Sequence, residues 1–203
     1  MNLIKRLLLA AVLMGSMSAQ AAETAPDVLA KNTTQEVLAL IKQDKDIQSG
    51  NQKKLLDLVE AKVLPHFDFT HMTRLAVGKN WRAATPVQQQ ALVNEFRTLL
   101  VRTYSNSLAA YKNQTIEFKP LKMQPGETDV TVKTQVIQPG GQPVPIDYSM
   151  EKLQDGWKVY DVTVDGVSLV INYRGSFATE VRQGGIDGLI KVLAEKNQSS
   201  AKK

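Results

Sequence analysis

The sequence contains no cysteine among its 203 residues and only two histidines, His66 and His71. Without cysteine the chain cannot form a disulfide bond, carry a lipid anchor on a cysteine, or use a thiolate as a nucleophile. The two histidines are five positions apart, a spacing that does not place both on one helical face, unlike the four-residue spacing of zinc hydrolase helices. We therefore expect neither a metal site nor a cofactor.

The sequence also lacks a long apolar run, since none approaches the roughly 20 residues of a transmembrane helix. Lys5 and Arg6 are followed by the shorter apolar run Leu7–Met14 and by small residues that end at Ala21. This order is typical of a secretory signal peptide. We predict a signal peptide over residues 1–21, one soluble domain over residues 22–196 and a disordered tail over residues 197–203.

Charge of neither sign dominates the chain. It has 25 Lys or Arg and 20 Asp or Glu side chains, and without Lys5 and Arg6 the count is 23 against 20, a net charge of +3. This mildly basic balance, with no concentrated basic stripe, argues against nucleic-acid binding.

The strongest helical pattern lies between Thr85 and Lys112. Thr85, Pro86 and Gln88 give the start signal of a capping box with a proline at the first helical position. An apolar stripe then recurs every three to four residues, through Leu92, Phe96, Leu99, Leu100, Thr103, Tyr104, Leu108 and Tyr111. Such a stripe needs a broad apolar surface to pack on, and the strand-rich segment that follows is the candidate.

Helical patterns also fill residues 26–49, 51–64 and 68–77, and after the long helix the apolar period changes from about 3.6 to 2. Alternating segments near residues 116–118, 130–136, 144–150 and 157–164 predict four strands joined by short links. Helical patterns return at residues 168–182 and 186–196, separated by Gly184 and Gly185. We predict an α+β fold with an antiparallel four-stranded sheet, a largely helical N-terminal half, and C-terminal helices packed on one face.

Few polar side chains are placed for catalysis. Asp161 and Asp165 lie four residues apart in or beside the last strand, so they could act as an acid and a base. No histidine, lysine or tyrosine is placed to complete them, and Asp165 is explained by the turn that it forms with Gly166. Ser168 lacks a G-x-S-x-G elbow. We expect no catalytic residue and no enzyme activity.

Several short stretches occur in one order along nearly the whole mature chain. They are Trp81–Pro86 leading to Gln89, the helix with Phe96, Leu100, Tyr104 and Tyr111, Trp157–Asp161, Gly166–Ser168, Arg174, and Gly184–Leu189. No single stretch is specific, but the set resembles the MlaC family. These are the periplasmic phospholipid-binding proteins of the maintenance-of-lipid-asymmetry pathway, also called the toluene-tolerance family.

The resemblance implies a soluble periplasmic carrier, which we expect to be a monomer. It would shuttle a glycerophospholipid between an outer-membrane lipoprotein-porin complex and an inner-membrane ABC transporter with an MCE-domain ring, and so maintain outer-membrane lipid asymmetry. The phospholipid would be cargo rather than a cofactor.

We expect an apolar lipid pocket enclosed between the apolar face of the sheet and the helices. The predicted lipid-binding residues are Phe67, Met72, Leu75, Phe96, Leu100, Tyr104, Val132, Ile146, Tyr148, Met150, Val167 and Leu169. Lys79, Arg82 and Arg174 are predicted at the pocket rim or on a partner surface.

Two other functions remain open. One is an exported enzyme with an NTF2-like cone of sheet and helices, which would use Asp161 and Asp165 on a hydrophobic substrate. The other is a structural periplasmic adaptor with a solid core. Lipid that co-purifies would exclude the adaptor, and loss of activity in an Asp161→Asn, Asp165→Asn double variant would identify the enzyme.

Overall fold

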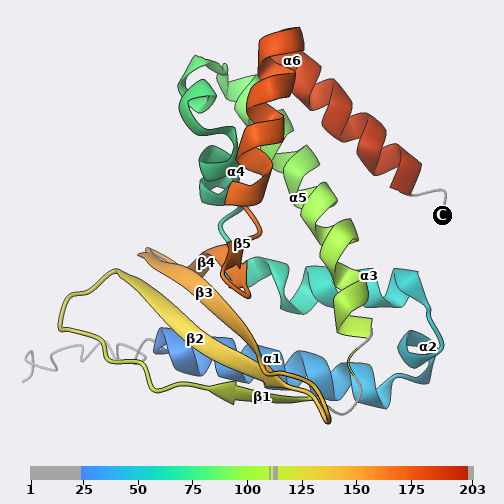
Figure 1. The fold of residues 1–203 in the computed structure, drawn as a ribbon, viewed down its shortest axis with the longest axis vertical. Helices are drawn as coiled ribbons and strands as arrows, with labels where there is room; N and C mark the ends of the chain where they lie inside the picture. Colours follow the sequence, from blue (N-terminus) through green and yellow to red (C-terminus); the bar gives the residue numbers. More distant parts are fainter. Residues whose placement is uncertain (1–23, 110, 112–113, 201–203) are drawn as a thin grey trace, which may run out of the picture.

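The structure is a computed structural model that describes residues 24–109, 111 and 114–200, so the predicted signal peptide lies outside the described residues. Figure 1 shows an elongated molecule with two ends. Helices α4 (Phe69–Val77), α6 (Arg174–Ser200) and the N-terminal half of α5 (Pro86–Ala109) form one end, called here the helical part. The sheet and α1 (Pro26–Gln43) form the other end, and α5 runs from the first to the second.

Shorter helices link these elements. They are α2 (Lys45–Gln48), α3 (Gln52–Lys62) and the 3-10 helices η2 (Leu64–His66), η3 (Gly78–Ala83) and η4 (Ile171–Tyr173). The start of α5 confirms the capping box, because Thr85 N donates to Gln88 Oε1 at 3.0 Å and Gln88 N donates to Thr85 Oγ1 at 3.3 Å. No helix in the described part of the chain is long and apolar enough to span a bilayer.

The sheet is antiparallel, with strands in the order in which they follow one another along the chain. Its strands are β1 (Thr115–Phe118), β2 (Asp129–Ile137), β3 (Val144–Leu153), β4 (Gly156–Val164) and β5 (Val167–Ser168). The predicted α+β class and antiparallel meander are confirmed, with a fifth strand beyond the four predicted. β5 is only two residues long, too short to give an alternating pattern, and the sequence instead predicts a helix that begins at its second residue, Ser168.

A β-bulge in the β3–β4 pairing decides which side chains share a face. Tyr148 pairs with Val162 and Ser149 with Asp161, but Met150 pairs with Val159, so β4 has one extra residue at this point. Side chains on directly paired residues lie on the same face of a sheet. The apolar face therefore contains Val159 before the bulge and Val162 after it.

The C-terminal helix differs from the prediction at its end. Gly185 adopts φ 68° and ψ −169°, which interrupts α6 and confirms the predicted break between two helical segments. The helix then continues to Ser200, so the disordered tail is wrong for residues 197–200, and residues 201–203 lie outside the described part. Asn197 explains the extension, because its Nδ2 donates to Glu95 O at 2.9 Å and to Glu95 Oε2 at 2.7 Å.

Candidate functional site

Three clusters of buried apolar side chains divide the interior. The first lies in the helical part and contains Met72, Phe96, Leu100, Phe177 and Leu189 among others. The second covers the apolar face of the sheet and contains Val130, Val132, Met150, Trp157 and Val159. The third contains Val37, Ile41, Ile47 and Leu55, from α1 to α3. Phe67 packs against both the first and the second cluster, so it marks where the helical part meets the sheet.

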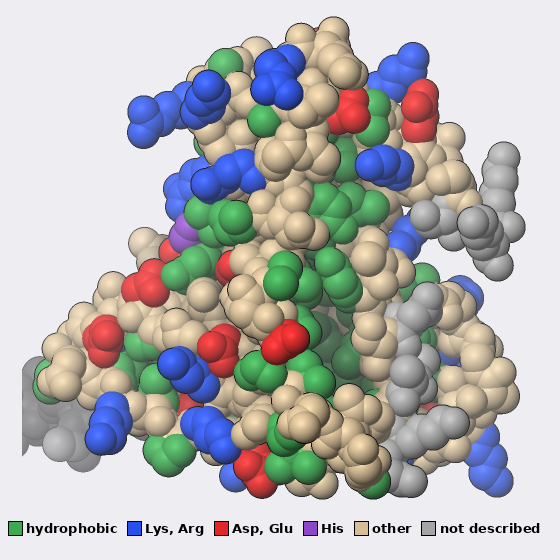
Figure 2. Space-filling view, viewed as in Figure 1, with side chains coloured by type: hydrophobic (Ala, Val, Ile, Leu, Met, Phe, Trp, Pro, Cys, Tyr) green, Lys and Arg blue, Asp and Glu red, His purple; other side chains and the backbone are tan. Residues whose placement is uncertain are grey.

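The surface is hollowed where these clusters approach one another. Figure 2 shows hydrophobic side chains gathered in a hollow between the sheet and the C-terminal half of α5. Half of the predicted lipid-binding residues are half-buried, so solvent reaches part of each side chain: Phe67, Leu75, Tyr104, Ile146, Tyr148 and Leu169. An apolar side chain that stays partly accessible can still contact a ligand. Contact of these six residues with lipid remains a prediction.

Tyr148 has the surroundings expected of a cavity wall. Its side chain is half-buried, yet burial raises the pKa of its phenol above the ordinary value, and the Thr134 hydroxyl opposes this shift only in part. A group can be surrounded by protein atoms and still be reached by solvent when it lines a concave surface. Ile146 lies two residues earlier on β3 and therefore on the same face of the sheet.

Tyr104 on α5 is also half-buried, and it packs against the first cluster. Burial raises the pKa of Tyr104 to about 12, and the neighbouring Tyr173 phenol adds to the shift. Tyr173 in turn packs edge-on against Phe96, with ring centroids 5.2 Å apart. Tyr104 thus lies at the edge of the packed interior of the helical part, where solvent still reaches part of its side chain.

The other predicted lipid-binding residues have different environments. Met72, Phe96, Leu100, Val132 and Met150 are buried against protein atoms, and Phe96 and Val132 have no exposed surface. They form the packed layer behind the half-buried side chains. Val167 lies at the opposite extreme, because 54% of it is exposed on the short strand β5.

The three predicted rim cations lie on the surface of the helical part. Lys79 and Arg82 are exposed on η3. Arg174, at the start of α6, donates from Nε and Nη2 to Leu75 O at 3.0 and 2.8 Å. This guanidinium therefore joins α6 to α4 beside a residue of the predicted pocket, and its binding role remains a prediction.

Sequence reasoning missed two half-buried side chains of this region. Val162 pairs directly with Tyr148, and Tyr173 neighbours Tyr104. Val162 was missed because strict alternation from Trp157 places residues 159, 161 and 163 on the apolar face, and only the bulge moves position 162 there. Tyr173 lies in a 3-10 turn, which has no apolar period to reveal it.

Asp161 has a structural role that accounts for its burial. Its Oδ1 accepts from Val162 N at 2.8 Å and from Val170 N at 3.3 Å, and its Oδ2 accepts from Ser168 Oγ at 2.6 Å. The carboxylate thus holds the turn from β4 through β5 to η4. Asp165 is exposed in that turn with φ 49°, a left-handed conformation that suits a turn residue.

Replacing Asp161 with alanine is expected to destabilise the protein by about 2–4 kcal/mol, because the buried Val170 N–H and the Ser168 hydroxyl lose their acceptor. Asp161→Asn is the matched control, since its amide keeps one oxygen acceptor and the same shape, and its loss should be clearly smaller. Urea denaturation followed by circular dichroism measures both values. Equal stability of Asp161→Ala and the wild type would show that these hydrogen bonds do not hold the turn.

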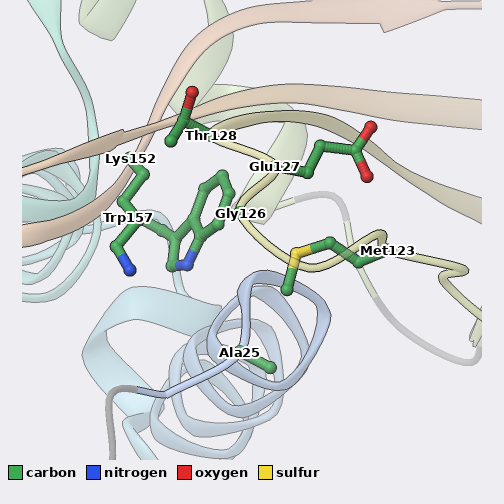
Figure 3. Close-up of a pocket in the computed structure, with 7 residues that line it drawn as sticks. All are labelled: Ala25, Met123, Gly126, Glu127, Thr128, Lys152 and Trp157. Carbon is green, nitrogen blue, oxygen red and sulfur yellow. The ribbon is translucent and has the colours of Figure 1, made fainter.

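Two further cavities lie away from the hollow. One, of about 280 Å³, is lined by Ala25, Met123, Gly126, Glu127, Thr128, Lys152 and Trp157, and Figure 3 shows Trp157 and Met123 on facing sides of it. The other, of about 410 Å³, lies between α1, α2 and α3. Pockets for drug-sized ligands measure roughly 300–1,000 Å³, and a diacyl lipid is larger than such a ligand. Cavities below or near the lower end of that range therefore have no room for a diacyl lipid. Neither is lined by a predicted lipid-binding residue.

Known proteins are similar to this chain in sequence over most of its length. The chain is 28% identical to the toluene tolerance protein ttg2D of Pseudomonas putida, over 98% of this chain and 95% of that protein. It is 24% identical to the intermembrane phospholipid transport system binding protein MlaC of Haemophilus influenzae, over 86% of this chain and 83% of that protein.

A solved structure of a related protein has a similar fold. The phospholipid-binding protein of Ralstonia solanacearum, determined in complex with a phospholipid, superposes with a TM-score of 0.81. It is 40% identical, and the match covers 88% of this chain and 99% of that one. The model of the MlaC protein family matches residues 31–195, from α1 to α6. The chain therefore belongs to the MlaC family.

Proposed function

We propose that this protein is a phospholipid carrier that holds its lipid in the hollow between the sheet and α5. The observation that carries this proposal is the phospholipid bound to the Ralstonia solanacearum protein, which shares 40% of its residues and the fold. In this chain Tyr104, Ile146 and Tyr148 are half-buried, so each keeps partly accessible apolar surface that would line the hollow. The acyl chains would lie against these side chains, and the head group would face solvent.

The free energy of lipid transfer explains why such a carrier needs an apolar hollow. Each buried methylene is worth about 0.8 kcal/mol, so two acyl chains with roughly 30 methylenes would cost about 24 kcal/mol to expose to water. Free diffusion of a phospholipid through an aqueous compartment is therefore excluded. A carrier that buries both chains in surroundings nearly as apolar as a bilayer keeps transfer at either membrane close to balanced.

The carrier would reside in the periplasm after removal of residues 1–21. Its partners would be an outer-membrane lipoprotein-porin complex and an inner-membrane ABC transporter with an MCE-domain ring. Lys79, Arg82 and Arg174 are exposed on one end of the molecule, where they could face a partner or the lipid head group. This role requires binding rather than catalysis, in keeping with the hydrogen bonds that occupy Asp161.

Native mass spectrometry of the purified mature protein tests the proposal. The expected result is a mass excess equal to one phospholipid, which is released only on denaturation and is identified after organic extraction. We expect the phospholipid to stay bound during purification, because transfer of both acyl chains to water is unfavourable. Incubation of delipidated protein with liposomes should restore the same mass.

A ligand-free mass with no uptake from liposomes would contradict the carrier function. A non-lipid apolar molecule in the hollow would instead favour the enzyme as the function of this fold.

A further inference from the structure

A cluster of polar side chains lies outside the lipid hollow, where the helical part meets the polar face of the sheet. It consists of Asp68, which caps α4, His71 in the first turn of α4, and Glu151 on β3. One ligand atom from each of the three lies within 4.8 Å of the other two. His71 Nδ1 is 2.5 Å from Glu151 Oε1, and all three residues are half-buried.

The cluster carries more negative charge than its surroundings neutralise. Among the described residues, no lysine or arginine forms an ion pair with Asp68 or Glu151, and His71 is the one basic group bound to Glu151. Lys158 lies directly opposite Glu151 in the sheet, but its Nζ contacts Asp155 Oδ2 and Pro65 O, each at 2.8 Å. Partly buried carboxylates are normally paired with a cation or coordinate a metal.

The surrounding contacts also fix the three side chains in position. His71 N donates to Asp68 Oδ1 at 2.8 Å, which orients the carboxylate and leaves Oδ2 for another interaction. The imidazole stacks on Tyr160, with ring centroids 4.3 Å apart and planes 13° apart. The Tyr160 hydroxyl donates to Asp129 at 3.0 Å. Contacts of this kind, behind the ligands, hold metal-binding side chains in their working orientation.

We propose that Asp68, His71 and Glu151 bind a divalent transition-metal ion, for which Zn²⁺ is the best match. One imidazole and two carboxylates are ligands that zinc accepts, and a water molecule would complete four-fold coordination. Ligand atoms in a tetrahedral zinc site lie about 3.3–3.6 Å apart, given bonds of about 2.0–2.2 Å. Small side-chain rotations from the present separations would reach that geometry, with the ion replacing the His71–Glu151 hydrogen bond.

This site joins two parts of the chain that the sequence does not connect. Glu151 lies 80 residues after His71, so a search for ligands at helical spacing around the histidines cannot find it. A metal bound here would link α4 to β3 and hold the helical part against the sheet. Glu151 lies on the opposite face of β3 from Tyr148 and Met150, so this ligand does not face the apolar side of the sheet.

Isothermal titration with ZnCl₂ of the full mature protein, purified without a histidine tag, tests the site. We expect saturable binding of one equivalent, weakened at least 10-fold in His71→Ala and in Glu151→Gln. The glutamine keeps the size of the side chain, so it preserves the fold if His71→Ala does not. His66→Ala is the matched control, because it removes the other half-buried histidine and should leave the affinity within two-fold.

Co²⁺ gives a second readout, because its visible absorption reports the ligands directly. The spectrum of the wild type with Co²⁺ should change in Glu151→Gln and stay the same in His66→Ala. Absence of saturable Zn²⁺ binding, or equal affinities in the wild type and both cluster variants, would overturn the proposal. An equal loss in His66→Ala would also overturn it, since it would identify unspecific binding by accessible histidines.

Discussion

The Ile146→Trp variant is expected to lose at least nine-tenths of its bound phospholipid while keeping its fold. Ile146 is half-buried beside Tyr148 on the apolar face of the sheet, so an indole at this position would occupy space that the proposal gives to the acyl chains. Tryptophan is favoured in strands, and the side chain has partly open space in which to turn. Lipid extracted per mole of protein, measured by mass spectrometry, gives the result.

Lys133→Trp is the control for this variant. Lys133 pairs with Asp147 on the polar face of the same sheet and is exposed, so its indole would not reach the hollow. We expect a full lipid load in this control. Wild-type lipid content in a folded Ile146→Trp protein would show that the lipid lies elsewhere, and a lower thermal stability with equal lipid content would show that Ile146 is part of the packed interior.

Most secondary structure could be predicted because local chemistry specifies it. Thr85 and Gln88 cap α5 through the two hydrogen bonds that the sequence implies. Strand β2 shows clear two-residue alternation of buried and exposed side chains, and Gly185 has a positive φ that interrupts α6. Each of these features depends on residues that are close in sequence, so the local sequence pattern is sufficient to predict it.

The features that the sequence did not reveal depend on distant contacts. Asn197 is ordered because Glu95, about a hundred positions earlier, accepts its hydrogen bonds. The bulge opposite Met150 exists only in the paired strands, and it changes which β4 side chains face the hollow. The short strand β5 similarly depends on pairing with Thr163 and Val164.

The sequence predicts which kinds of side chain form the candidate site, but it does not predict how deeply each side chain is buried. An apolar stripe gives the direction of a side chain, but does not tell a residue at a ligand surface from one packed behind it. Tyr104 and Phe96 are both on the inner stripe of α5, yet Tyr104 is half-buried and Phe96 has no exposed surface. The difference comes from α6 and η4, whose aromatic side chains cover Phe96.

Phe96→Ala is therefore expected to affect stability rather than lipid contact. The Phe96 ring lies 5.2 Å from those of both Tyr173 and Phe177, in edge-on arrangements that join α5 to η4 and α6. Truncating a fully buried phenylalanine costs about 3–5 kcal/mol. For a chain of this size that corresponds to a fall of roughly 6–20 °C in the melting temperature. Thermal unfolding of the delipidated protein, followed by circular dichroism, measures the change.

Two further variants on α5 test what decides the effect of a substitution on stability and lipid content. It could depend on how deeply the side chain is buried or on its position along the helix. Val87→Ala removes an apolar side chain that is 80% exposed, so the melting temperature should hardly change. Tyr104→Ala should cost less stability than Phe96→Ala but lower the lipid content of the purified protein. The opposite result, a stable Phe96→Ala protein without lipid, would mean that the ring contacts the acyl chains. The hollow would then extend into the interior of the helical part, where Phe96 packs against Tyr173 and Phe177.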